Sequence, residues 1–171
     1  IKAIGIDKTS IEGYLFPDTY IFFKGEKAEN VIKRMVARLF DILKPSQEYK
    51  IRSMTFTTHE ILTIASMIER EAMGDREKPI IASVIYNRLE KNIPLQIDAT
   101  VLYALGYHKS RVLYRDLKVK SPYNTYLNKG LPPGPIASPG FQSIMAALHP
   151  ARTDYLYYVA TGRGDHIFSK T

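Results

Sequence analysis

The chain has 171 residues, which fits one domain of ordinary size with a buried hydrophobic core. Hydrophobic residues make up 45% and charged residues 24%, as in globular proteins, and no apolar run is long enough to cross a membrane. The absence of cysteine excludes disulfides, thiolate nucleophiles and cysteine-ligated zinc. The net charge of +7 favours an acidic partner such as nucleic acid, an anionic membrane surface or an anionic cell-wall glycan.

The N-terminal part predicts extended structure and turns. Residues 1–11 predict a short strand entering from a preceding region, and the start at Ile1 without methionine indicates an excised fragment. Residues 12–23 (EGYLFPDTYIFF) are rich in aromatic side chains, and Gly13 and Pro17 mark turns between short extended pieces.

A supporting amphipathic helix is predicted over residues 26–43, ended by Pro45. Its inward face consists of apolar residues at helical spacing: Ile32, Met35, Val36, Leu39, Phe40 and Leu43.

The next helix is predicted over residues 58–73 and ends near Gly74. Thr57 and Glu60 match a capping box, in which the threonine caps the helix and the glutamate reaches back. Its buried face comprises Ile61, Leu62, Ile64, Ala65, Ile68 and Ala72. Glu69 and Glu71 fall on opposite shoulders of that face, so periodicity does not choose between them.

A third helix is predicted over residues 75–91, with Pro79 in its first turn. Its inward residues are Ile81, Val84, Ile85 and Leu89.

Residues 95–100 allow two interpretations after the break at Pro94. An extended strand would place Gln96, Asp98 and Thr100 on one side. Alternatively, Asp98 caps a short helix over residues 99–105 that Gly106 closes, and this interpretation is favoured.

The C-terminal half begins with a basic surface loop or short helix over residues 106–120. The Pro/Gly-rich residues 121–140 also carry apolar and aromatic anchors, which predicts a structured functional loop. Ser138 is expected to cap a helix that begins at Pro139 and runs to Leu148.

The last segment predicts a hairpin of residues 155–160 and 166–169. The predicted fold class is α+β, a single domain over residues 1–171. Its helices pack around the helix of residues 58–73, beside a small antiparallel sheet formed by the terminal segments.

Several kinds of site are disfavoured by the motifs. Thr63 stands where zinc proteases carry the second histidine after His59 and Glu60, and the other histidines are scattered. Phosphate-binding and dinucleotide-binding glycine patterns and the Gly-x-Ser-x-Gly elbow are missing. Lysines and arginines are spread over helix exteriors, which disfavours nucleic acid. Carboxylate chemistry remains, because a glutamate beside an apolar face can have the raised pKa of a general acid.

At these residues the chain resembles the MltG/YceG-like endolytic murein transglycosylase family. The similar segments occur in the same order and span nearly the whole chain: residues 12–20 (EGYLFPDTY), 65–72 (ASMIEREA), 82–89 (ASVIYNRL), 95–100 (LQIDAT), 123–126 (YNTY), 130–139 (GLPPGPIASP) and 149–162 (HPARTDYLYYVATG). Several co-linear motifs make this resemblance specific.

The resemblance implies a lytic transglycosylase that cleaves the β-1,4 bond between N-acetylmuramic acid and N-acetylglucosamine of nascent peptidoglycan strands. The muramyl C6 hydroxyl attacks C1 and leaves a 1,6-anhydro end, so one carboxyl group can act as acid and then as base. The resemblance favours Glu69 for this role, with Glu71 in a supporting position. It also implies a glycan groove lined by further polar and aromatic residues: Gln96, Asp98, Tyr123, Asn124 and Tyr126.

The resemblance implies no cofactor and no metal. It implies glycan strands as substrate, peptidoglycan synthases as candidate partners, and no nucleic acid. Family members carry a membrane anchor and a LysM-like region before this domain, which predicts a location at the extracytoplasmic face of the bacterial plasma membrane. Two alternatives stay open: a non-catalytic glycan-binding module, and a two-carboxylate hydrolase with Asp98 as the second acid.

Overall fold

The structure is a computed structural model that describes residues 10–43, 49–107, 109 and 111–171. Its helices are α1 (Ala28–Ile42), α2 (Thr58–Glu71), α3 (Lys78–Glu90), α4 (Asp98–Leu105), the 3-10 helix η2 (Asp116–Lys118) and α5 (Phe141–Leu148). The strands are β1 (Tyr49–Ile51), β2 (Met54–Phe56), β3 (Tyr157–Ala160) and β4 (His166–Ser169). Within the described residues no helix has the length and apolar character needed to cross a membrane.

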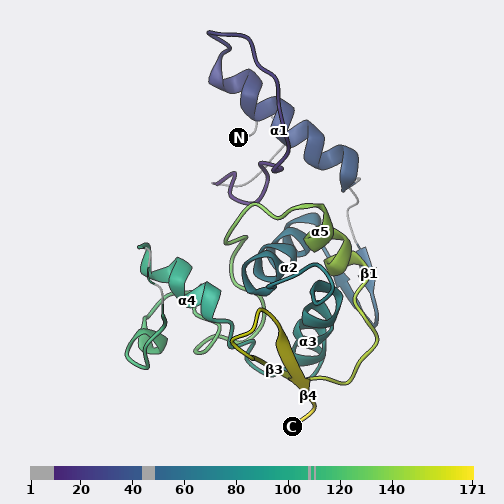
Figure 1. Cartoon of the computed structure of the whole chain (residues 1–171), viewed down its shortest axis with the longest axis vertical. Helices are drawn as coiled ribbons and strands as arrows, with labels where there is room; N and C mark the ends of the chain where they lie inside the picture. The colour runs from purple at the N-terminus through teal and green to yellow at the C-terminus, as the bar shows by residue number, and fades with distance from the viewer. Residues whose placement is uncertain (1–9, 44–48, 108, 110) are drawn as a thin grey trace.

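The core lies where α2, α3 and α5 pack against one another (Figure 1). Every residue of α2 from Ile61 to Ile68 is buried, because this helix has neighbours on several sides. Its N-terminus carries the predicted capping box: Thr57 Oγ1 accepts from the Glu60 N–H, and the Glu60 carboxylate accepts from the Thr57 N–H at 2.8 Å. The predicted α+β class with helices around this helix is confirmed.

The sheet differs from the prediction of one sheet built by both terminal segments. Two separate antiparallel hairpins are present in the described chain, β1–β2 and β3–β4. The β3–β4 hairpin was predicted, whereas β1–β2 was not. Its tight turn places Arg52 at a positive φ of 57°, a conformation that no turn residue in the sequence indicated. The strand predicted over residues 1–11 falls almost entirely outside the described residues.

Two predicted helix caps are wrong. Helix α5 begins at Phe141 with Gly140 as its N-cap, so Ser138 does not cap it. Helix α4 forms as predicted and Gly106 closes it at φ 72°, but the Asp98 side chain makes no capping bond. In both cases a contact distant in sequence replaces the local cap.

Motifs far apart in sequence meet on one side of α2. The buried Ser66 hydroxyl accepts from the Ile136 N–H at 3.0 Å and so ties the 121–140 loop to the helix. Gly13 lies so close to this loop that a Cβ atom there would stand 2.4 Å from Pro135. The loop is therefore structured, as predicted.

Helix α1 lies at one end of the molecule, away from the C-terminal hairpin (Figure 1). Its buried residues Val36 and Leu39 belong to the predicted inward face, and Leu43 continues it. Arg38 pairs with Asp18 at 2.8 Å, which fastens the preceding extended segment to the helix.

Candidate active site

Four of the predicted site residues come together around one cavity of about 240 Å³. It lies between the C-terminal end of α2, the bend before α4 and the β3–β4 hairpin. The predicted residues that line it are Glu71, Gln96, Asp98 and Tyr126. Arg88, Tyr158 and His166 complete its polar wall.

The Glu71 carboxyl is an acid of this cavity with a raised pKa. Burial raises its pKa, although two hydrogen bonds partly oppose the shift. Oε1 accepts from the Ala99 N–H at 3.3 Å and Oε2 accepts from the Tyr158 hydroxyl at 3.1 Å. Burial and the coulombic effect of Glu71 raise the pKa of Tyr158, so its hydroxyl keeps its proton. Glu71 is therefore suited to hold a proton and to donate it inside a cavity.

Glu69 faces a different part of the molecule. Its Oε2 accepts from the Gly140 N–H at 3.2 Å and from the Ser143 hydroxyl at 2.5 Å. The ammonium of Lys78 lies 3.6 Å from the same oxygen. Gly140 and Ser143 form the N-terminal turn of α5, so Glu69 supplies the negative charge and the acceptor that this helix end lacks.

Helix geometry explains the separation of the two acids. Residues two apart on an α-helix point about 200° apart. Glu69 therefore turns toward α3 and α5, and Glu71 turns toward α4 and β3. Glu69 does not line the cavity that holds the other predicted residues, and its catalytic role stays a prediction.

Asp98 and Tyr126 form a pair on the cavity wall. The Tyr126 hydroxyl donates to Asp98 Oδ1 at 2.5 Å, across 28 residues of sequence. Burial and this bond raise the pKa of Tyr126, which keeps it a donor. The Asp98 carboxylate is thus engaged by Tyr126, and the Glu71 carboxylate accepts the Ala99 N–H at the N-terminus of α4 instead.

Gln96 lies on a strained bend at the cavity mouth. It has a φ of 55°, which a residue with a side chain seldom adopts, and its N–H donates to Thr125 O at 3.1 Å. Its side-chain oxygen accepts from Arg88 at 3.2 Å.

Tyr123 and Asn124 lie away from this cavity. The Tyr123 ring packs against Tyr103 with centroids 4.7 Å apart. Asn124 is fully buried and donates to the carbonyls of Leu117 and Val119, both at 2.9 Å. The structure gives Asn124 a loop-stabilising role, and direct glycan contact by either residue stays a prediction.

Sequence reasoning missed Arg88, Tyr158 and His166. Arg88 is only 7% exposed, and its Nε and Nη1 donate to backbone carbonyls, among them Leu95 O at 2.9 Å. Within the described chain it has no carboxylate partner. Its helical spacing from Ile81 and Ile85 was a usable signal, because an arginine on a buried helix face needs polar partners. No local pattern marked Tyr158 or His166.

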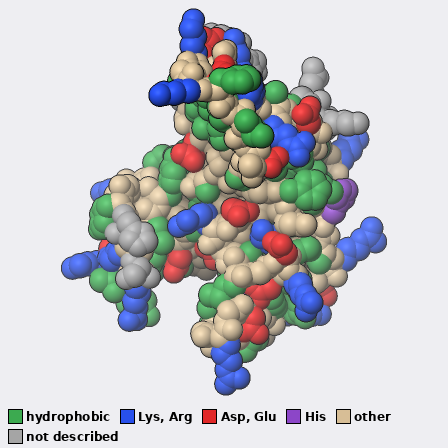
Figure 2. Space-filling view, turned by 45° about the horizontal axis from the view of Figure 1, so that its top comes forward, with side chains coloured by type: hydrophobic (Ala, Val, Ile, Leu, Met, Phe, Trp, Pro, Cys, Tyr) green, Lys and Arg blue, Asp and Glu red, His purple; other side chains and the backbone are tan. Residues whose placement is uncertain are grey.

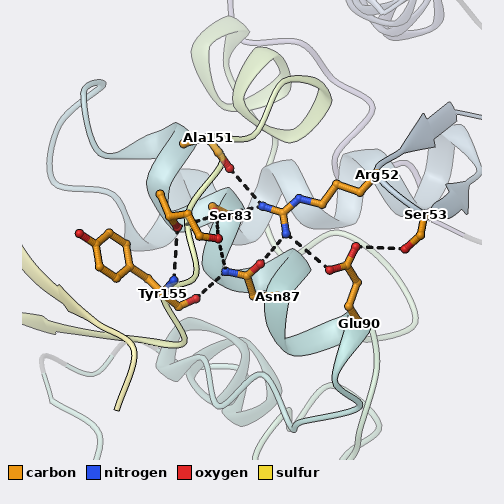
Figure 3. A network of polar contacts seen from close by, with 8 residues as sticks. Arg52, Ser53, Ser83, Asn87, Glu90, Ala151 and Tyr155 are labelled. Atoms are coloured by element: carbon orange, nitrogen blue, oxygen red, sulfur yellow. Dashed lines mark hydrogen bonds and ion pairs between the residues drawn. The ribbon is translucent and has the colours of Figure 1, made fainter.

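A separate polar network fixes the segment that leads into β3 (Figure 3). The Arg52 guanidinium donates to Asn87 Oδ1, Ser83 Oγ and Ala151 O. The Asn87 amide in turn donates to Thr153 O at 2.9 Å and Tyr155 O at 2.7 Å. Tyr158 lies three residues after Tyr155, so this network holds the segment from which the Tyr158 hydroxyl reaches Glu71.

Charge on the face seen in Figure 2 is dispersed. Lysines and arginines stand around the whole outline, with acidic side chains between them. On this face no single basic patch of the kind found at nucleic-acid interfaces is seen.

The chain resembles known proteins over almost all of its length. A family model described as the YceG-like family matches residues 2–171. A Bacillus subtilis protein named endolytic murein transglycosylase is 49% identical, covering 96% of this chain and 46% of that protein. A Streptococcus pneumoniae protein of the same name is 38% identical, covering 88% of this chain and 28% of that protein.

A crystal structure of a yceG-like protein from Listeria monocytogenes has the same fold. It matches with a TM-score of 0.80 and 48% sequence identity, covering 94% of this chain and 53% of that one. The chain spans about half the length of this protein and of the Bacillus relative, and less of the Streptococcus one. With its fold, its cavity and these matches taken together, the chain belongs to the YceG-like family.

Proposed function

We propose that this chain carries the catalytic site of an endolytic lytic transglycosylase that acts on peptidoglycan glycan strands. The observation that carries the proposal is the Glu71 carboxyl, whose pKa burial raises inside a cavity lined with hydrogen-bonding side chains. The names of the relatives from Bacillus subtilis and Streptococcus pneumoniae support the same activity.

The reaction needs a proton donor at the glycosidic oxygen between N-acetylmuramic acid and N-acetylglucosamine. Glu71 is the proposed donor, in preference to Glu69, because Glu69 is engaged at the N-terminus of α5. As the bond breaks, the muramyl C6 hydroxyl attacks C1 and closes the 1,6-anhydro ring. Gln96, Asp98 and Tyr126 supply amide, carboxylate and hydroxyl groups for hydrogen bonds to the sugars.

A two-carboxylate hydrolase is the second candidate, because Asp98 lines the same cavity as Glu71. The two reactions differ in their products. Hydrolysis leaves reducing ends, whereas transglycosylation leaves anhydro ends.

Mass spectrometry of uncrosslinked glycan strands tests the proposal. The unmodified chain is expected to produce anhydro-ended fragments that disappear with Glu71→Gln. Reducing-end products that disappear with Asp98→Asn would support the hydrolase instead. Binding without cleavage would indicate a glycan-binding module.

The cellular setting is part of the proposal. The proposed location is the extracytoplasmic face of the bacterial plasma membrane, where the proposed substrate is found, with an anchor outside these residues. Peptidoglycan synthases are the proposed partners, since they supply nascent strands.

A further inference from the structure

The Glu71 cavity contains a second titratable side chain that the proposed reaction has not used. His166, the first residue of β4, lines the cavity, and its side chain is 6% exposed. Its Nδ1 lies 3.0 Å from Glu77 Oε2, and its backbone N–H donates to Glu77 Oε1 at 2.6 Å. Both oxygens of Glu77, just before α3, thus hold one histidine.

Glu77 fixes the tautomer of the His166 ring. Burial opposes the shift, but the hydrogen bonds from His166 lower the pKa of Glu77, so its carboxylate is ionised and can only accept. The proton of the neutral ring therefore resides on Nδ1, and Nε2 carries the lone pair.

Nε2 of His166 is available for a further hydrogen bond. Among the residues that the structure describes, this atom has no hydrogen-bond partner. Every fully buried side-chain nitrogen of those residues does have a partner. The atom is therefore not fully buried, and the cavity that holds Glu71 is the one that His166 lines.

His166 also lies close to the Glu71 acid. The Tyr158 ring stands edge-on to the His166 ring with centroids 5.3 Å apart, and the Tyr158 hydroxyl donates to Glu71. Glu77 before α3 holds Nδ1, and the other titratable or charged groups that line the cavity with His166 come from several elements: Glu71, Arg88, Asp98, Tyr126 and Tyr158. An acid and an oriented imidazole in one cavity form the arrangement that divides proton donation from proton acceptance.

We propose that His166 Nε2 is the proton acceptor for the attacking hydroxyl, while Glu71 is the proton donor to the leaving oxygen. This inference rests on the proposed function. The bond from C1 to the glycosidic oxygen breaks, and that oxygen takes the Glu71 proton. The C6 oxygen bonds to C1 and releases its proton to Nε2. Transfer of that proton to Glu71 through water restores both groups, so no co-reactant is required.

The decisive variant is His166→Asn, whose amide nitrogen can still donate to Glu77 but which lacks Nε2. His59→Asn is the matched control, because both nitrogens of His59 are engaged, with the Tyr14 hydroxyl and Pro133 O at 2.9 Å each, in a different cavity. Anhydro-end formation is measured under single-turnover and steady-state conditions across pH, and circular dichroism checks the fold.

We expect His166→Asn to lower kcat about 100-fold with KM within about twofold of the unmodified chain. The dependence of the rate on pH should differ from that of the unmodified chain, because the imidazole is gone. His166→Gly should regain rate with added imidazole, which gives a readout that a purely structural role would not. His59→Asn should match the unmodified chain.

A folded His166→Asn variant with an unchanged rate and pH profile overturns the inference but leaves the proposed function intact. Failure of imidazole to restore any rate to folded His166→Gly also overturns it. Absence of anhydro ends from the unmodified chain removes the proposed function, and the inference falls with it.

Discussion

Glu69 and Glu71 stand two positions apart on α2, yet the fold gives them opposite surroundings. The Glu69 carboxylate meets the N-terminal turn of α5 and the Lys78 ammonium, and its side chain is 33% exposed. The Glu71 carboxyl lies in the cavity, where burial raises its pKa. Partners brought in from α4, α5 and β3 thus decide which acid stabilises the fold and which can donate a proton.

The largest expected effect is a loss of activity when Glu71 is replaced but not when Glu69 is replaced. Glu71→Gln should lower the rate of anhydro-end formation by about 10²–10⁴-fold, because the amide has no proton to donate as an acid. Glu69→Gln, which is equally close to isosteric, should retain activity within about threefold. Mass spectrometry of timed glycan digests measures both. The reverse result would return the acid role to Glu69, as the resemblance favoured.

Next in size is the effect of the network that positions Tyr158 against Glu71. Asn87→Ala leaves the Thr153 and Tyr155 carbonyls without the amide donor, so the free energy of unfolding should fall by about 2–3 kcal/mol. Urea unfolding measures this loss. The control is Asn30→Ala on α1, where the asparagine is exposed and should cost under about 0.5 kcal/mol. Equal losses in the two variants would contradict a role specific to Asn87.

A smaller effect is expected on stability, where Glu69→Gln, the variant that keeps its activity, should lower the free energy of unfolding. Glu69→Gln removes the negative charge at the α5 N-terminus and should lower the free energy of unfolding by about 1 kcal/mol. Ser143→Ala should cost less in this background than in the unmodified chain, because the Ser143 hydroxyl then donates to a neutral amide oxygen instead of a carboxylate. If Glu69→Gln costs nothing, the carboxylate does not stabilise α5.

The smallest effect concerns the pH dependence of stability. The folded pKa of Glu71 is raised, so its contribution is fully present below the unfolded value of about 4.3 and is lost as pH rises through the folded pKa. From about pH 4 to neutral pH, the unmodified chain should therefore lose stability that the Glu71→Gln variant does not lose, so the difference in free energy of unfolding should shift in favour of the variant. Urea unfolding at several pH values measures this difference. If the difference in free energy of unfolding stays constant with pH, the pKa of Glu71 is not raised in the folded chain.

Local patterns predicted those parts of the fold whose contacts are local. Helix α2 follows apolar periodicity and a capping box within four residues, and the hairpin β3–β4 follows its turn residues. The β1–β2 hairpin was missed because its turn places Arg52 in a left-handed conformation. In that position Arg52 donates to Ser83 and Ala151, which are distant in the sequence. The Asp98 cap was wrong because α4 begins at Asp98 itself, and Glu71, 28 residues away in the sequence, accepts the Ala99 N–H.

The sequence by itself determined the helical framework, the order of the family motifs and the presence of two acids at the end of one helix. Only the tertiary structure separated Glu69 from Glu71 and added Arg88, Tyr158 and His166 to the cavity. The physical reason is that burial and hydrogen bonding set the protonation of a carboxyl group, and both depend on neighbours from other elements. Spacing along one helix specifies the direction in which each side chain points, and the fold specifies which groups it meets.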